Sequence, residues 1–264
     1  MSPKTALFAG LIDYAGLFPP AALDMPAAVR QYVSYARGRY CWMLERFIVP
    51  VARLGEMRQA AAALGGSDDW KLSVLARPGD PLPPEIDSVE MKMERAEDIR
   101  RISGSLPALR YFEIPIGADP REFVAALEET GSRAKVRTGG ATPETYPGVP
   151  ELARFLCACA EARVPFKATA GLHHPVRSGA KHGFVNLFLA AALAYHGGSR
   201  EDVTATLEET SAEAFHWEAE GVGWGEHRMT AFEIAAARER FAIAFGSCSF
   251  EEPLADLQSL GWLH

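Results

Sequence analysis

Residues 134–140 read Ala-Lys-Val-Arg-Thr-Gly-Gly and residues 165–171 read Pro-Phe-Lys-Ala-Thr-Ala-Gly, and these two stretches decide the fold. Each has the pattern of a buried strand that ends in small residues, and the helical pattern of Glu151–Ala162 lies between them. A strand, a helix and a second strand in this order are typical of a parallel unit whose strands end at the same edge of the sheet. We therefore expect Lys135 and Lys167 to come close together at that edge.

The alternation of strand and helix patterns continues along the whole chain. Strand-like runs occur at Leu11–Ala15, Phe47–Pro50, Lys71–Ala76, Ser88–Met93, Arg110–Ile114, Ala134–Arg137, Phe166–Ala170 and Phe241–Phe245. Helical patterns lie between them at Pro26–Ala36, Leu54–Leu64, Ala96–Ile102, Pro120–Glu129, Glu151–Ala162 and Gly183–Tyr195. Eight such strands predict one α/β domain over residues 1–264, a (β/α)8 TIM barrel in preference to an open doubly wound sheet.

One segment departs from this alternation. Residues 215–228 contain Glu220 and Gly221 between two aromatic-rich arms, which is typical of a hairpin. We expect a small hairpin or lid here, inserted before the last helix and strand. Thr230 and Glu233 have the spacing of a capping box, which predicts that a helix begins directly after the insertion.

The composition describes an ordinary globular protein and excludes several classes. The 264 residues include 34 acidic and 27 basic side chains, which gives a net charge of −7. Binding to phosphates needs a basic face, so this charge argues against a nucleic-acid partner. The longest apolar run, Gly183–Tyr195, is too short to cross a bilayer. The four cysteines are too few and too irregularly placed for a disulfide framework, so we expect a soluble cytoplasmic protein.

Charged residues interrupt two of the predicted strands. In Ser88–Met93 the apolar positions suit the face toward the helices, so Glu90 and Lys92 share the interior face. A charge inside a barrel costs free energy unless it is paired. Either an ion pair that fills the barrel or a proton-transfer pair at the strand end would explain Glu90 and Lys92. Glu113 is a similar isolated charge in its strand.

The predicted strands Ala134–Arg137 and Phe166–Ala170 add three cations on the interior face. Lys135 and Arg137 have the same parity on one strand, as Lys167 and Thr169 do on the next. Three cations that converge on one opening predict a small anionic substrate. Two neighbouring ammonium groups also lower each other's proton affinity, which favours a nucleophilic amine near neutral pH.

Four short motifs resemble those of the deoxyribose-phosphate aldolase family, in the same order and mainly within residues 85–250. Residues 135–139 resemble that family's strand-six motif Lys-Thr-Ser-Thr-Gly, and residues 167–171 resemble its strand-seven motif Lys-Ala-Ser-Gly-Gly. Residues 246–249 are similar to its phosphate-binding turn Gly-(Thr/Ala)-Ser-Ser, and residues 85–89 resemble its acidic strand four.

The resemblance implies a class I aldolase-like lyase that needs no cofactor and cleaves or forms a carbon–carbon bond in a small phosphorylated or carboxylated carbonyl compound. It implies that Lys135 forms the Schiff base, that Lys167 lowers the pKa of Lys135, and that Asp87 helps to move protons. Glu90 and Lys92 complete the expected catalytic group. The residues expected to contact the substrate are Glu113, Arg137, Thr138, Thr169, Gly171, His173, His174, Gly246, Ser247, Cys248 and Ser249.

The turn after the eighth strand is expected to bind the substrate's anionic group. Gly246 permits a tight turn, and Ser247, Cys248 and Ser249 lead into a helix near Phe250. Unpaired backbone N–H groups at such a helix start attract phosphate. The alternative is an ordinary capped helix in which Ser249 satisfies its own backbone.

Two departures from the family keep other functions open. Arg137 stands where the family has a small residue, and it would narrow the pocket or bind a carboxylate. His173 and His174 follow the seventh strand, with His182 nearby, and Asp13, Glu90 and Glu113 are the carboxylates that could complete a metal site. Their spacing matches no strong zinc signature. A metal-dependent lyase or hydrolase and a non-catalytic binding barrel remain as alternatives, and the sequence leaves open whether the chain forms a homo-oligomer.

Overall fold

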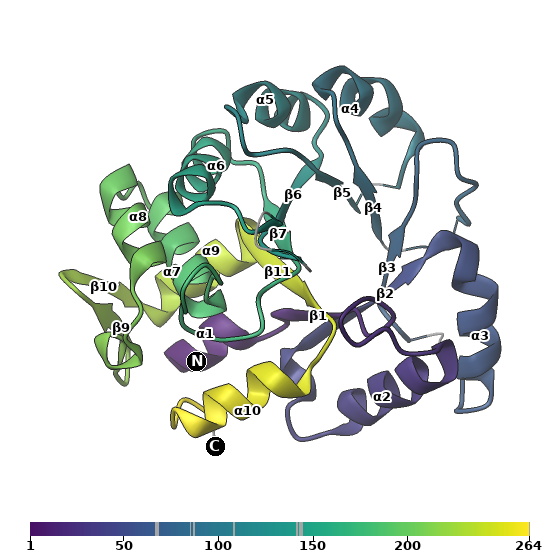
Figure 1. Cartoon of the computed structure of the whole chain (residues 1–264), viewed down its shortest axis with the longest axis horizontal. Coiled ribbons are helices and arrows are strands. Elements are labelled where there is room, and N and C mark those ends of the chain that lie inside the picture. Colours follow the sequence, from purple (N-terminus) through teal and green to yellow (C-terminus); the bar gives the residue numbers. More distant parts are fainter. Residues whose placement is uncertain are drawn as a thin grey trace.

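Eight parallel strands close into a barrel in the order β1-β11-β7-β6-β5-β4-β3-β2, surrounded by helices (Figure 1). The computed structural model describes residues 1–66, 69–84, 86, 88–107, 109–140, 142 and 145–263. The barrel strands are β1 (Ile12–Tyr14), β2 (Leu44–Pro50), β3 (Leu72–Leu75), β4 (Ser88–Lys92), β5 (Leu109–Glu113), β6 (Arg133–Arg137), β7 (Phe166–Thr169) and β11 (Ala242–Ser247). The predicted (β/α)8 barrel is confirmed.

The described helices include the six expected from their patterns, the two whose starts were expected after Thr230 and near Phe250, and two that the sequence pattern did not reveal, α1 and α8. They are α1 (Pro3–Phe8), α2 (Met25–Arg37), α3 (Leu54–Ala62), α4 (Ala96–Ile102), α5 (Arg121–Glu129), α6 (Val149–Glu161), α7 (Phe184–Tyr195), α8 (Arg200–Glu208), α9 (Ala231–Arg240) and α10 (Glu251–Ser259). In the described part of the chain, no helix has both the length and the apolar character that a membrane span requires.

Local sequence signals fix several helix starts. The Asp24 carboxylate accepts the N–H of Ala27 at 2.7 Å and caps α2. Thr230 and Glu233 form the expected capping box at the start of α9. The α7 helix is buried on nearly all sides, and its Asn186 amide donates to two backbone carbonyls in and after α8. This side chain holds α8 against α7.

The apolar core lies between the strands and the helices. Fully buried aromatic rings on the outer face of the strands pack against helix residues, for example Phe166 on Phe155 of α6 and Phe245 on Phe184 of α7. The inner face of the barrel is polar, and side-chain ion pairs between strands that are not neighbours cross it. Its buried polar residues include Asp13, Ser73, Ser88, Glu90, Glu113, Lys135 and Lys167.

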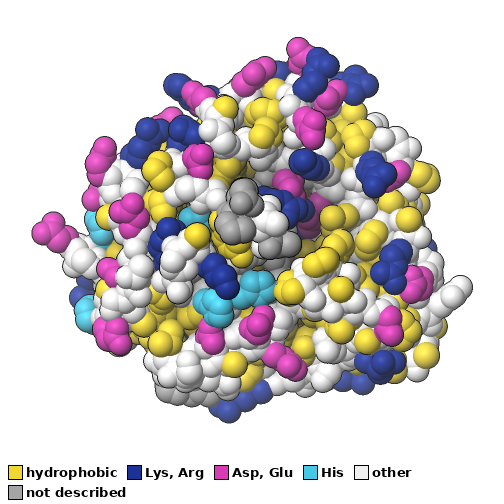
Figure 2. Space-filling model, viewed as in Figure 1, with side chains coloured by type: hydrophobic (Ala, Val, Ile, Leu, Met, Phe, Trp, Pro, Cys, Tyr) yellow, Lys and Arg dark blue, Asp and Glu magenta, His cyan; other side chains and the backbone are white. Residues whose placement is uncertain are grey.

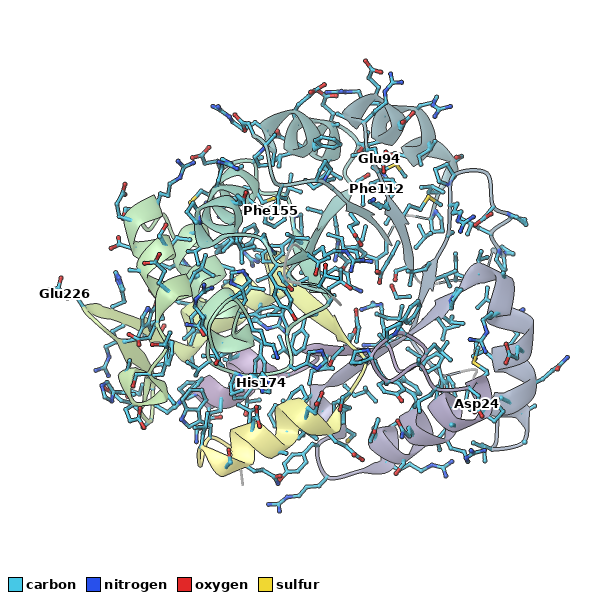
Figure 3. All side chains as sticks on the ribbon, viewed as in Figure 1. Asp24, Glu94, Phe112, Phe155, His174 and Glu226 are labelled. Carbon is cyan, nitrogen blue, oxygen red and sulfur yellow. The ribbon has the colours of Figure 1, made fainter. Side chains whose placement is uncertain are left out.

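The inserted segment forms a small antiparallel sheet of β8 (His216–Trp217), β9 (Gly221–Trp224) and β10 (His227–Thr230). The expected hairpin is therefore present, but the expectation of a lid is wrong. The sheet lies at the edge of the molecule beside α8, away from the centre of the barrel, with Glu226 at its outer tip (Figures 1 and 3). Its Trp224 indole donates to Thr206 of α8 at 2.9 Å, so it packs on the helix layer.

Candidate active site

Charged side chains of alternating sign form a row across the barrel interior, beginning at the end of β6. Arg137 Nε lies 2.9 Å from Oε1 of Glu113 on β5. The other oxygen of Glu113 lies 3.1 Å from Nζ of Lys135. Nζ of Lys135 also lies 2.8 Å from Oε2 of Glu90, which comes from β4 on the other side of β5. One ammonium group is thus placed between two carboxylates.

The row continues from Glu90 to the deepest charged residues. Oε1 of Glu90 accepts a hydrogen bond from Lys167 Nζ at 2.5 Å and another from Ser73 Oγ at 2.5 Å. Lys167 also donates to Oδ2 of Asp13 on β1, and the other oxygen of Asp13 accepts the backbone N–H of Arg46 at 3.0 Å. The two ends of this row therefore lie on β6 and β1, and it spans the interior.

Strand register explains why these residues meet. Lys135 is the Cα partner of both Lys167 on β7 and Glu113 on β5. Neighbouring parallel strands at equal register point the same way, so these three side chains share one level of the barrel. The prediction that the two lysines lie together at adjacent strand positions is confirmed.

The charges of the inner part of the row depend on one another. Burial alone would raise the pKa of Glu90, but the ammonium groups of Lys135 and Lys167 hold it well below its usual value. Burial alone would lower the pKa of Lys167, but the carboxylates of Asp13 and Glu90 outweigh it and raise that pKa. For Asp13 burial outweighs the ammonium of Lys167, so the pKa of this carboxyl group is raised. Because Glu90 stands between the two lysines, the ammonium groups do not face each other without a counterion.

The two lysines pair with different sets of carboxylates. Lys167 donates hydrogen bonds to Asp13 and Glu90. Lys135 forms ion pairs with Glu90 and Glu113, at 2.8 Å and 3.1 Å. Glu113 is also paired with Arg137, so Lys135 belongs to the outer part of the row.

Exposure increases along the row toward the carboxyl ends of the strands. Lys167 is 1% exposed and Lys135 4%, whereas 49% of the Arg137 side chain is exposed. Figure 2 shows Lys or Arg and Asp or Glu side chains together in the hollowed centre of this face. The site therefore opens at Arg137, and Lys135 lies nearer to that opening than Lys167.

The expected pairing of Glu90 with Lys92 is not formed. The Lys92 side chain is 70% exposed and lies 3.3 Å from Glu94, which follows β4. Lys92 has the parity of Glu90 and is the Cα partner of Glu113, yet its side chain leaves the barrel interior. Asp87, the other expected proton carrier, lies outside the described residues.

The loops after β6 and β7 are held tightly together. The Thr138 hydroxyl donates to the Ala170 carbonyl at 2.6 Å, and the Thr138 N–H donates to the Thr169 carbonyl at 2.9 Å. A Cβ added to Gly139 would lie 2.8 Å from the Cα of Gly171, which has φ +78°. Thr138 and Gly171 were both predicted to contact the substrate. In the structure they hold the backbones of the two loops together and so shape the wall of the site.

The two adjacent histidines face α10 instead of the interior carboxylates. His173 Nδ1 lies 2.8 Å from Glu252, and His174 Nδ1 lies 2.6 Å from Asp256, beside α10 in Figure 3. His182 is buried, and its Nε2 lies 2.8 Å from a backbone carbonyl of the loop before α6. Among the described residues, no three His, Cys, Asp or Glu side chains are grouped as metal ligands. The metal site assembled from these histidines and the interior carboxylates is not formed.

The turn after β11 satisfies its own backbone. Ser247 Oγ donates to the Ser249 carbonyl at 2.7 Å, and Ser249 Oγ accepts the N–H of Glu252 at 3.1 Å. Glu251 and Glu252 occupy the first turn of α10. This arrangement matches the capped helix rather than the anion site expected from the sequence.

The other two residues of that turn have different surroundings. Cys248 is buried, and burial raises the pKa of its thiol. Gly246 faces the interior, where a Cβ would lie 3.1 Å from Ile48 and 3.4 Å from the Thr169 hydroxyl. The absent side chain therefore leaves space beside Thr169.

Sequence reasoning missed the part that Asp13 plays. The sequence suggests Asp13 only as a metal ligand, whereas it is the carboxylate at the β1 end of the row and pairs with Lys167. A charged residue between Ile12 and Tyr14, in a strand that is otherwise apolar, was the available signal.

Two surface hollows lie away from this site. They measure about 290 and 540 Å³, lie outside the barrel along α6 and α8, and share Cys157, Glu161 and Arg200. Neither is lined by a residue of the interior row.

The fold and the row of charged side chains together define the class of this protein. It is a (β/α)8 barrel with two lysines on neighbouring strands, each paired with a carboxylate inside the barrel. No protein-family model matches the chain, and no curated protein sequence matches it. Its function is therefore inferred from its own residues.

Proposed function

We propose that this barrel is a Schiff-base lyase of the aldolase type, in which Lys135 attacks the carbonyl group of a small substrate. The observation that supports this most strongly is the buried placement of Lys135 between the carboxylates of Glu90 and Glu113. The short motifs around Lys135 and Lys167 that resemble deoxyribose-phosphate aldolase favour the same chemistry.

The cost of burying these charges also supports a catalytic role. Ion pairs inside a protein gain little stability over well-packed apolar residues, because both charges lose their hydration. A barrel interior can be filled with branched apolar side chains alone. Buried, coupled charges at the end of a barrel where ligands bind are typical of a functional site.

In the proposed reaction the ammonium of Lys135 first passes a proton to Glu113, and the resulting amine adds to the carbonyl carbon. Glu113 then returns the proton to the hydroxyl group of the carbinolamine, which leaves as water and gives a protonated imine. Cleavage of the neighbouring carbon–carbon bond sends its electron pair into the imine and forms an enamine. The hydroxyl proton of the departing fragment passes to a carboxylate. Protonation of the enamine and hydrolysis of the imine release the second product and restore the amine. The reverse sequence forms the bond.

The carboxylates beside Lys135 stabilise the charged intermediate. A protonated imine is positive where the ammonium was, so Glu90 and Glu113 attract it as they attract the ammonium. Lys167 acts through Glu90, since it keeps that carboxylate ionised and in place. This differs from the expectation that Lys167 acts on Lys135 directly.

Of the two carboxylates beside Lys135, Glu113 is better placed than Glu90 to carry a proton. It stands at the end of β5, closer to the opening than Glu90, and it contacts Lys135 through an oxygen that Arg137 does not use. Glu90 is held by Lys167 and Ser73, which restricts its movement.

Borohydride reduction in the presence of aldehydes and 2-oxo acids tests this function. Intact mass measurement should show one reduced adduct per chain with at least one of these compounds, and Lys135→Met should abolish it. Lys71→Met removes an exposed lysine and serves as the control. An adduct of equal yield in Lys135→Met and wild type would contradict the proposal.

A further inference from the structure

We propose that the substrate is a 2-oxo acid, a compound with a carboxylate directly beside its carbonyl group, and that Arg137 binds this carboxylate. The inference rests on the proposed function, because it names the substrate class of the same site. It narrows the phosphorylated or carboxylated carbonyl compound that the sequence left open.

Arg137 has N–H groups at the opening of the site that the described hydrogen bonds do not use. Its Nε contacts Glu113, and 49% of its side chain is exposed. A guanidinium has five N–H donors in a planar fork, and the described contacts of Arg137 use the Nε edge. The outer edge of the fork matches a carboxylate, which it can bind with two parallel hydrogen bonds.

Arg137 and Lys135 are also the right neighbours for this substrate. They contact the two oxygens of one carboxylate, with Arg137 Nε 2.9 Å from Oε1 and Lys135 Nζ 3.1 Å from Oε2 of Glu113. In a 2-oxo acid the carboxylate carbon is bonded directly to the carbonyl carbon. Binding of the carboxylate by Arg137 therefore brings the carbonyl carbon toward Lys135.

The turn after β11 is poorly suited to bind a phosphate group. The serines of that turn already bond to its backbone, and Glu251 and Glu252 begin the following helix. His173 is paired with Glu252 and so does not offer an unopposed charge. A phosphate carries close to two negative charges at neutral pH, so these two carboxylates would repel it.

The test compares three probes of similar size in the borohydride assay: pyruvate, its uncharged methyl ester, and hydroxyacetone phosphate. We expect pyruvate to reach half-maximal adduct yield at a concentration about tenfold or more below that of the ester, as a charge-assisted bond implies. In Arg137→Met the pyruvate concentration that gives half-maximal adduct yield should rise by a similar factor. The corresponding concentration of the ester should change far less. Arg95→Gln, which removes an exposed arginine after β4, is the matched control.

A second measurement does not depend on imine formation. Lactate has the carboxylate but no carbonyl group, so it should bind the wild-type protein in a calorimetric titration and bind Arg137→Met about tenfold more weakly. Thermal unfolding of Arg137→Met checks that the variant is folded.

The outcomes separate the two proposals. Three outcomes would contradict a 2-oxo acid substrate but not the Schiff base: equal adduct formation at Lys135 with pyruvate and its ester, a preference for the phosphate compound, or lactate binding that is unchanged in Arg137→Met. Lactate binding through Arg137 without any adduct at Lys135 would instead overturn the Schiff-base function and show a carboxylate-binding barrel.

Discussion

Lys135 and Lys167 contact opposite oxygens of the Glu90 carboxylate, at 2.8 Å and 2.5 Å. The shared counterion places the two lysines in different surroundings. Lys167 is fully buried and donates to the carboxylates of Asp13 and Glu90, so it serves to fix Glu90. Lys135 pairs with Glu113, which also contacts the half-exposed Arg137, so Lys135 lies closer to the opening and is the lysine available to a substrate.

Removal of the shared carboxylate should be costly. Glu90→Gln leaves two buried ammonium groups with one counterion fewer, so we expect the free energy of unfolding to fall by about 3–5 kcal/mol at pH 7. Urea unfolding measures this. Glu56→Gln breaks an exposed ion pair with Arg53 and should leave the midpoint close to that of wild type. A Glu90→Gln midpoint equal to wild type would show that the row adds no stability.

The pH dependence of stability should depend on the same residue. The pKa of Glu90 in the folded protein is below its ordinary value of 4.5, so its stabilising effect is full above that pH and is lost as the pH falls below it. Glu113, whose pKa is also lowered, adds to this effect. We expect wild type to lose stability steeply from about pH 5 downward and Glu90→Gln to lose it less steeply. Parallel curves from thermal unfolding at pH 3 to 7 would contradict the assignment.

Asp13 and Lys167 should be strongly coupled. Lys167→Met leaves Asp13 and Glu90 without their shared cation and should cost about 3–5 kcal/mol. Asp13→Asn added to Lys167→Met should cost less than the two single changes together, with a coupling of about 2 kcal/mol in a double-mutant cycle. Additive effects would mean that the two residues stabilise the barrel independently.

The close approach of the loops after β6 and β7 gives a matched pair of glycine substitutions. Gly171 and Gly179 both have positive φ, but an added Cβ at Gly171 meets the Gly139 backbone at 2.8 Å, whereas at Gly179 it meets open space. Gly179→Ala should cost about 1 kcal/mol from backbone strain alone, and Gly171→Ala should cost clearly more. The adduct yield at Lys135 should also fall only in Gly171→Ala. Equal stability losses would show that the loops separate freely.

Much of the fold could be predicted because the strand and helix periods are clear in the sequence. The runs Ala134–Arg137 and Phe166–Ala170 gave two strands nearly to the residue, and their parity placed Lys135 and Lys167 on one face. The α8 helix was missed because its apolar pattern is weak, although Ser199 and Asp202 form a capping box at its start. The position of the β8–β10 sheet depends on packing against α8, which no local pattern contains.

The site was predictable in its members but not in its pairing. Parity identified Glu90, Lys92 and Lys135 as inward-facing, yet parity and level do not decide which charges meet. Lys92 shares the level of Glu113 and Lys135, but its side chain extends to solvent and pairs with Glu94. Asp13 meets Lys167 only because closure of the barrel brings β1 near β7, with β11 between them.

The position of the borohydride-reduced adduct shows directly whether Lys135 is the nucleophile. After incubation of the wild-type protein with a 2-oxo acid, peptide mapping by tandem mass spectrometry should find the reduced substrate on Nζ of Lys135, at a yield near one per chain. Lys167 should be unmodified, because it is fully buried and bonded to two carboxylates. Adducts spread over exposed lysines such as Lys71 and Lys92, with none on Lys135, would contradict the assignment of Lys135 as the nucleophile.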